Sequence, residues 1–232
     1  MKSLAIIPAR GGSKRIPRKN VKHILGKPII ERTIETILES RNFSDVFVST
    51  DDPEVMEIAT EAGAQIPFTR PKSLSDDLTG TIPVIQHAIH SLQQDGWSFE
   101  AVCCIYPTAV LVSSQVLNRS YESFKQSDKG FLVPVLRYRH PIQRALSVGE
   151  NGSLEMIDPQ RFSQRTQDLP ASFHDAGQFY WGTVETWLKS HSFFSSNTTP
   201  FELSPLEAQD IDSEVDWEIA ELLLSKKTAT RP

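Results

Sequence analysis

The sequence of 232 residues predicts an α/β protein built on a mainly parallel sheet in three layers. Three observations predict this class. Short apolar runs typical of buried parallel strands recur along the chain, and the first occupies residues 4–8. Amphipathic segments with helical spacing separate these runs, as crossover helices do. The chain is 39% hydrophobic, which is enough for a full core, so we expect a single domain over 1–232.

The expected elements alternate along the first half of the chain. Strands are expected at 4–8, 46–48, 101–106 and 131–136, and helices from Pro28 onward, from 54 to a stop at Gly63, at 81–94 and at 113–126. Ligands in such sheets bind at the carboxyl ends of the strands. The loops that follow residues 8 and 49 are therefore expected to lie at the ligand site.

The elements expected near the C-terminus follow a longer irregular stretch. A strand-like run spans 174–182, and a short helix spans 184–189. A last helix follows a capping box of Ser213 and Asp216. We expect residues 226–232 to be frayed. The apolar face of the last helix is expected to consist of Val215, Ile219, Leu222 and Leu223.

Composition and net charge limit the kinds of partner and compartment that we expect for this chain. A formal net charge of -5 argues against nucleic acid as the main partner. No stretch approaches the ~20 apolar residues of a membrane helix, and a strand that begins at the N-terminus leaves no signal peptide. The two cysteines, Cys103 and Cys104, are adjacent and cannot form a disulfide framework. We therefore expect a cytoplasmic protein that does not bind a membrane.

A basic loop follows the first strand. Five of the ten residues from Arg10 to Lys19 are basic. Gly11 and Gly12 allow the backbone to approach a ligand closely and to adopt positive φ, and the amides of such a turn, beside Lys and Arg, form a site for several negative charges. The Walker and dinucleotide glycine patterns are both absent. The loop predicts a polyphosphate site, with a solvated basic patch or a nucleic-acid surface as the alternative.

Two acidic residues lie near the end of the chain. Asp210 and Asp212 are two positions apart in an extended segment, so their carboxylates point to the same side. Two carboxylates held together repel each other unless a cation joins them, and hard oxygen ligands suit Mg²⁺. Spacing alone favours metal binding and helix capping about equally.

The loop sequence at 7–14, Ile-Pro-Ala-Arg-Gly-Gly-Ser-Lys, with Pro17, Lys19-Asn20 and the Gly-Lys-Pro at 26–28, resembles the opening of the CMP-sialate synthetases. These sugar nucleotidyltransferases activate nine-carbon acidic sugars. The resemblance runs from about residue 4 to 223 and implies a Rossmann-like, GT-A-like fold. It implies that Asp210 and Asp212 bind Mg²⁺ and act in catalysis with Lys19. The residues that it assigns to CTP are Arg10, Gly11, Gly12, Ser13, Lys14, Lys19, Asn20, Arg70 and Asp76.

Several segments resemble the branch of this family that acts on pseudaminic acid. They are Cys-Cys-Ile-Tyr-Pro-Thr-Ala at 103–109, Gln-Arg-Ala-Leu at 143–146, Arg-Thr-Gln-Asp-Leu at 165–169 and His-Asp-Ala-Gly-Gln-Phe-Tyr-Trp at 174–181. The implied reaction transfers CMP from CTP to the anomeric hydroxyl of this sugar and releases pyrophosphate. N-Acetylneuraminate or legionaminate as the sugar, and a non-catalytic CTP-binding homologue, are the alternatives. The expected sugar-side residues are Tyr106, Thr108, Arg165, His174, Gln178 and Tyr180.

The regular alternation of elements breaks at about 137–172. This stretch mixes charged, aromatic and turn residues and is too long for a simple connection. Apolar residues within it, such as Met156 and Phe162, argue against disorder. We expect a lid, an acidic-sugar site or a dimer arm. Arg165, by resemblance, would reach the sugar carboxylate or the phosphates from this excursion, and its aromatic residues suggest a homodimer.

Overall fold

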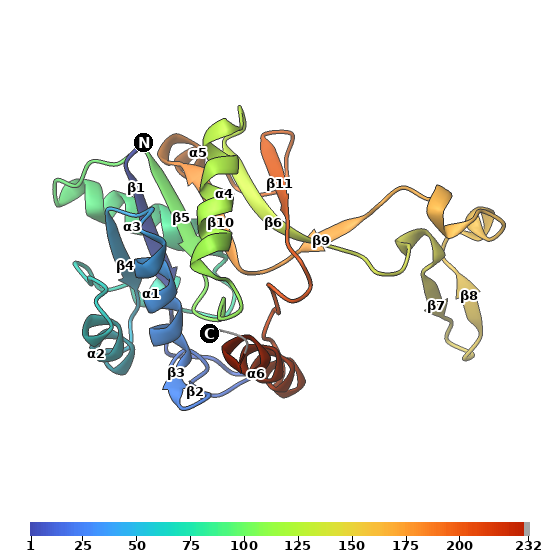
Figure 1. Cartoon of the computed structure of the whole chain (residues 1–232), viewed down its shortest axis with the longest axis horizontal. Coiled ribbons are helices and arrows are strands. Elements are labelled where there is room, and N and C mark those ends of the chain that lie inside the picture. The colour runs from blue at the N-terminus through green and yellow to red at the C-terminus, as the bar shows by residue number, and fades with distance from the viewer. Residues whose placement is uncertain (230–232) are drawn as a thin grey trace.

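A mixed sheet forms the centre of the chain in the computed structural model, which describes residues 1–229 (Figure 1). Five of its six main strands run in the same direction, and β10 is antiparallel to both of its neighbours. The short β9 (Phe173–Asp175) extends the sheet beside β6. The strand order is β11 (Thr198–Glu202), β6 (Phe131–Arg137), β10 (Phe179–Thr183), β5 (Ala101–Ile105), β1 (Ser3–Pro8) and β4 (Asp45–Ser49).

Helices cover both faces of this sheet, which confirms the three-layer prediction. On one face lie α1 (Ile29–Ser40), α2 (Pro53–Glu61) and α4 (Ser114–Gln126). On the other lie α3 (Thr81–Gln94) and α5 (Val184–Lys189). The side chains of β5 alternate between the two layers, so Cys103 packs with the first group and Cys104 with the second. Both cysteines are fully buried.

A third apolar cluster joins the basic loop to the C-terminal helix α6 (Glu214–Ala229). Ile16 of the loop, Ile211 and Trp217 are all buried in it. The hairpin of β2 (His23–Ile24) and β3 (Lys27–Pro28) contributes Ile24 to the same cluster. This packing brings the loop after β1 and the C-terminal segment together and places the acidic pair beside the basic loop.

The buried face of α6 differs from the sequence prediction. Trp217, Ala220 and Leu224 are buried. Of the four predicted residues, Leu223 is partly buried against the same cluster, whereas Val215, Ile219 and Leu222 are exposed. The reason is that α6 packs on loop residues and on α1 instead of lying flat on the sheet. The expected fraying is also wrong for 226–229, which are helical, and residues 230–232 lie outside the described residues.

The predicted excursion leaves the sheet at the end of β6 and returns at β9, and we call residues 137–172 the arm. Figure 1 shows it projecting away from the rest of the chain. It carries the antiparallel pair β7 (Leu146–Val148) and β8 (Leu154–Met156). Five of its large apolar side chains, at 146, 148, 154, 157 and 162, are more than half exposed. Within the arm, short 3₁₀ turns occur at Ile142–Arg144, Pro159–Arg161 and Thr166–Asp168. Another, at Lys72–Leu74, lies between α2 and α3.

Candidate active site

A cleft of about 690 Å³ opens at the carboxyl ends of β1 and β5, the edge where the sequence predicts the site. The N-terminus of α3 forms one wall, and the segment before α6 forms another. Thus segments from both ends of the chain and from its middle meet here. The sequence-predicted residues that line the cleft are Arg10, Ser13, Lys14, Lys19, Asn20, Arg70, Tyr106, Thr108, Asp210 and Asp212.

The basic loop is held in shape by its own polar contacts. The buried side chain of Asn20 donates to the carbonyl of Arg10 at 2.8 Å and closes the loop. The amide of Gly11 donates to Asp51 Oδ1 at 3.2 Å. Gly11 and Gly12 do not adopt positive φ. Gly11 is required for space, because a Cβ there would overlap the carboxylate of Asp52.

The cations of the loop are matched by acidic groups across the cleft. Arg10 Nη1 lies 2.6 Å from Asp77 Oδ1, and Lys14 pairs with the other oxygen of Asp77. These two partners, Lys14 first, hold the pKa of Asp77 below its usual value. Arg15 Nη2 lies 2.6 Å from Asp212 Oδ1. A bound polyphosphate would therefore compete with carboxylates for the same cations.

Lys19 bridges the loop and the acidic segment. Its Nζ donates to the carbonyl of Ile211 at 2.5 Å and lies 3.7 Å from Asp212 Oδ1. Burial lowers the pKa of Lys19, and this effect outweighs the opposing attraction of the two aspartates. Because 192 residues separate Lys19 from Ile211, only the fold creates this contact.

Arg70 is the most buried cation of the cleft. Its Nε donates to Ser49 Oγ at 3.1 Å, and its Nη2 donates to the Ser49 carbonyl at the end of β4. Burial lowers the pKa of Arg70 to about 10. Buried charges are normally paired, and Arg70 makes no ion pair with any described residue. Such an arrangement suits an anion brought by a ligand.

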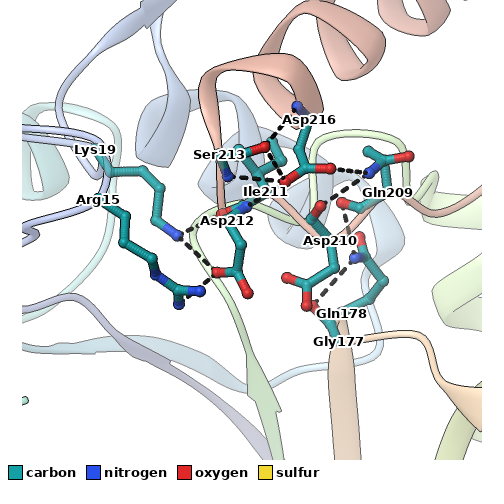
Figure 2. A network of polar contacts seen from close by, with 10 residues as sticks. All are labelled: Arg15, Lys19, Gly177, Gln178, Gln209, Asp210, Ile211, Asp212, Ser213 and Asp216. Atoms are coloured by element: carbon teal, nitrogen blue, oxygen red, sulfur yellow. Dashed lines mark hydrogen bonds and ion pairs between the residues drawn. The ribbon is translucent and has the colours of Figure 1, made fainter. Parts of the chain in front are cut away.

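The acidic pair lies on one side of the segment before α6 (Figure 2). Asp216 holds this segment, since its Oδ2 accepts from the amides of Asp212 at 3.1 Å and of Ser213 at 2.8 Å. Ser213 Oγ in turn accepts from the Asp216 amide at 3.3 Å, which confirms the predicted capping box. Burial, and then the charge of Asp212, raises the pKa of Asp210.

The donor set of this pair fits Mg²⁺. Both carboxylates line the cleft. Burial, and then the negative charge of Asp212, raises the pKa of Asp210 by disfavouring its ionised form. Within residues 1–229, no group of three or more His, Cys, Asp or Glu side chains could hold a metal ion. Two carboxylates, completed by phosphate oxygens and water, are a typical magnesium environment, whereas sites formed by protein alone need more ligands.

The predicted sugar-side residues separate into two groups. Tyr106 and Thr108 line the cleft, and the Tyr106 hydroxyl lies 2.5 Å from Thr81 Oγ1. The other four do not line it. Tyr180 is buried and donates to Asp175 Oδ2 at 2.7 Å. His174 is exposed at the base of the arm, and Arg165 is exposed on the arm itself.

Gln178 and Asp76 also lie away from the cleft surface. Gln178 is fully buried, and its amide nitrogen donates to three main-chain carbonyls. Asp76 Oδ1 accepts from the amides of Leu78 and Thr79 and so shapes its own loop, while its neighbour Asp77 lines the cleft. Gly11 and Gly12 support the loop without being part of the lining.

The structure adds residues to the site that the sequence prediction did not include. They include Arg15, Asp77, Thr79, Gly80 and Thr81. Arg15 belongs to the basic loop, so the charge cluster was the available signal. Nothing local distinguishes Asp77 from Asp76, since both are exposed aspartates in one turn. Only the facing wall of the cleft, with Arg10 and Lys14, decides between them.

The chain is similar to known cytidylyltransferases along almost its whole length. The family model described as Cytidylyltransferase matches residues 4–213. The pseudaminic acid cytidylyltransferase of Campylobacter jejuni is 44% identical over 223 residues, covering 96% of each chain. The CMP-N,N'-diacetyllegionaminic acid synthase of Legionella pneumophila is 30% identical over 231 residues, covering 97% of each. The solved CMP:2-keto-3-deoxy-manno-octonic acid synthetase complexed with CTP shares the fold, with a TM-score of 0.72 at 16% identity over 98% of this chain and 100% of its own.

Proposed function

The chain belongs to the cytidylyltransferase family, and from this premise we propose that it transfers CMP from CTP to the anomeric hydroxyl of pseudaminic acid and releases pyrophosphate. The observation that carries the choice of sugar is the 44% identity to a pseudaminic acid cytidylyltransferase across 96% of both chains. The synthase that makes the legionaminic acid derivative is less similar, at 30%. The arrangement of the cleft supports the same reaction.

The basic loop is proposed to bind the triphosphate. Phosphoryl transfer depends mainly on positioning the reactants in line and on neutralising charge. Arg10, Lys14 and Lys19 supply three cations on one wall, and Arg70 supplies a buried cation at the end of β4. On binding, Arg10 and Lys14 exchange the carboxylate of Asp77 for phosphate oxygens. These cations then stabilise the negative charge that develops on the leaving pyrophosphate.

Mg²⁺ is proposed as the cofactor, held by Asp210 and Asp212. When bound, it neutralises phosphate charge and polarises phosphate oxygens. Lys19 holds the acidic segment next to the basic loop through its contacts to Ile211 and Asp212. Tyr106 and Thr108, which line the cleft, are proposed to contact the sugar. The anomeric hydroxyl is the nucleophile. Its oxygen forms the new bond to the α-phosphorus as the bond to pyrophosphate breaks, and its proton is released to water.

A homodimer is proposed to complete the sugar side of the site. Arg165 and His174 lie on the arm or at its base and do not line the cleft of their own chain. The exposed apolar side chains of the arm, including Val148 and Phe162, provide a surface that a second copy would bury. In this arrangement Arg165 would reach the acidic sugar in the partner subunit's cleft.

The cytoplasm is proposed as the compartment. The two cysteines are free thiols in the core, as expected in a reducing environment. CTP, the proposed substrate, is an intracellular nucleotide. Among the described residues, no helix combines the length and apolar character needed to cross a bilayer.

The test is pyrophosphate release with CTP and Mg²⁺ in the presence of pseudaminate, N-acetylneuraminate, legionaminate or ketodeoxyoctulosonate. We expect turnover that prefers pseudaminate. Preference for another sugar would keep the reaction and contradict the sugar assignment. No turnover with any sugar, in a folded protein that binds CTP, would favour a non-catalytic homologue.

Asp212→Asn tests the metal assignment separately. The substitution preserves the size of the side chain and removes the charge that a cation needs. We expect turnover in Mg²⁺ to be lost while the fold remains intact by circular dichroism. Near-normal turnover would contradict the assignment of Asp212 to the metal.

A further inference from the structure

We propose that Gln178, which does not line the cleft, is a positioning residue that fixes Asp210 for metal binding. This inference rests on the proposed function of the acidic pair. Gln178 precedes β10, and its side chain is fully buried behind the segment that carries Asp210. Figure 2 shows Gln178 and Gly177 lying next to Gln209 and Asp210.

The carboxylate of Asp210 has no polar partner of its own. Among the described residues, no hydrogen bond or ion pair reaches its oxygens, whereas Asp212 is paired with Arg15 and Lys19. The position of the Asp210 side chain is therefore set by its main chain and by the surface against which it packs. A metal ligand held in this way depends on the groups that hold the main chain.

Gln178 holds the main chain immediately before Asp210. Its Nε2 donates to the carbonyl of Gln209 at 3.2 Å, across 31 residues of sequence. The same nitrogen donates to the carbonyls of Ala176 at 2.8 Å and Gly177 at 3.1 Å. Gln178 thus ties the turn between β9 and β10 to the acidic segment. Gln209 continues the chain of contacts, because its own Nε2 donates to the Asp210 carbonyl at 2.9 Å and to Asp216 Oδ1 at 3.2 Å.

Gly177 supplies the surface behind the carboxylate. Its φ is +61°, in the left-handed region, and its amide donates to Asp175 Oδ1 at 3.0 Å. A Cβ at this position would lie 3.0 Å from Asp210 Cγ and 3.1 Å and 3.2 Å from its two oxygens. The carboxylate therefore lies flat against the backbone of Gly177, and Gln178 fixes that backbone through the Gly177 carbonyl.

The chemistry of the buried amide supports a positioning role. Gln178 Oε1 is buried and has no hydrogen-bond partner among the described residues. An unpaired buried oxygen destabilises the fold, so an apolar side chain would serve packing better. What an apolar side chain cannot supply is a pair of N–H donors for the carbonyls of Gly177 and Gln209. We infer that these donors are the reason for glutamine at this position.

The test compares Gln178→Met with Gln86→Met. Methionine keeps the length and bulk of glutamine and removes both donors. Gln86 is a matched control, since its Nε2 also donates to three main-chain carbonyls, those of Trp187, Leu188 and Ser190, away from the acidic pair. Two quantities are measured: the Mg²⁺ concentration that half-saturates pyrophosphate release, and the affinity for Mn²⁺ with CTP and no sugar, followed by the EPR signal of free Mn²⁺.

For Q178M we expect both the half-saturating Mg²⁺ concentration and the Mn²⁺ dissociation constant to rise about tenfold or more, as is typical when a group behind a metal ligand is removed. The turnover number at saturating Mg²⁺ should remain within about threefold of wild type. Q86M should leave both metal measurements unchanged. If Q178M fails to fold, Gln178→Leu decides, because leucine also removes both donors and should cause the same weakening.

Two results would overturn the inference: wild-type metal affinity in Q178M, or the same loss of affinity in Q86M. Asp212→Asn separates this failure from a failure of the proposed function. If D212N binds Mn²⁺ as tightly as wild type, the metal assignment itself is wrong. If D212N loses Mn²⁺ and Q178M does not, only the positioning role of Gln178 is wrong.

Discussion

The substitution Arg70→Met separates the contribution of Arg70 to CTP binding from its contribution to the stability of the fold. The Arg70 side chain is 4% exposed, and burial lowers its pKa to about 10. A tenfold change in a proton equilibrium is about 1.4 kcal/mol, so the folded chain holds this charge at a cost of about 3 kcal/mol. The sign follows from the direction of the shift, because a lowered pKa means that the folded state disfavours the charged form at every pH below about 10.

Methionine removes that cost and also removes the donors to Ser49. Leaving the Ser49 carbonyl and hydroxyl without Arg70 costs about 1–3 kcal/mol. The two effects nearly cancel, so we expect the free energy of unfolding in urea to change by less than about 2 kcal/mol. CTP affinity should fall by about 2–4 kcal/mol, or about 30- to 1000-fold, because a buried cation no longer meets the nucleotide.

Calorimetric titration with CTP and urea unfolding followed by tryptophan fluorescence measure the two quantities. Arg32→Met is the matched control, since Arg32 also donates to main-chain carbonyls, those of Ile24 at 2.9 Å and Leu25 at 2.6 Å, outside the cleft. R32M should keep wild-type CTP affinity. Unchanged CTP affinity in R70M, together with a stability loss above about 3 kcal/mol, would show that Arg70 serves the fold alone.

Three further predictions concern other parts of the chain. Asp52→Ala should lower the free energy of unfolding at pH 7 by about 1 kcal/mol, because Asp52 caps α2. Arg18 keeps the pKa of Asp52 below its usual value, so the stability that Asp52 contributes is present above its unfolded pKa and is lost as pH falls through its folded pKa. In urea unfolding across pH 2–7, the stabilities of wild type and variant should therefore converge in acid. A difference that stays constant with pH would contradict this. Gly11→Ala should weaken CTP binding in calorimetry at least about tenfold, or about 1.4 kcal/mol, because its Cβ would displace the loop from Asp52; a variant that binds like wild type would refute the steric reason. Val148→Glu with Phe162→Glu should convert the proposed dimer to monomers in sedimentation without changing the free energy of unfolding, and a persistent dimer would rule out the arm as the interface.

Local patterns in the sequence determined the layered fold. Strand β1 and helix α3 follow from apolar periodicity, and the alternation of side chains on a strand sends Cys103 and Cys104 to opposite layers. The basic loop and the acidic pair were also recognisable, because charge clustering and a spacing of two residues are local properties. The capping box of Ser213 and Asp216 belongs to the same class of signal.

Only the tertiary structure decided which residues face one another. The buried face of α6 depends on Ile16, about 200 residues away, so helical periodicity within α6 could not identify it. The choice of Asp77 over Asp76 depends on cations across the cleft, and the role of Gln178 depends on a carbonyl 31 residues further along. The physical reason is common to all three. Periodicity reports which side of an element is apolar, whereas partners across a cleft or a core are set by packing between segments distant in sequence.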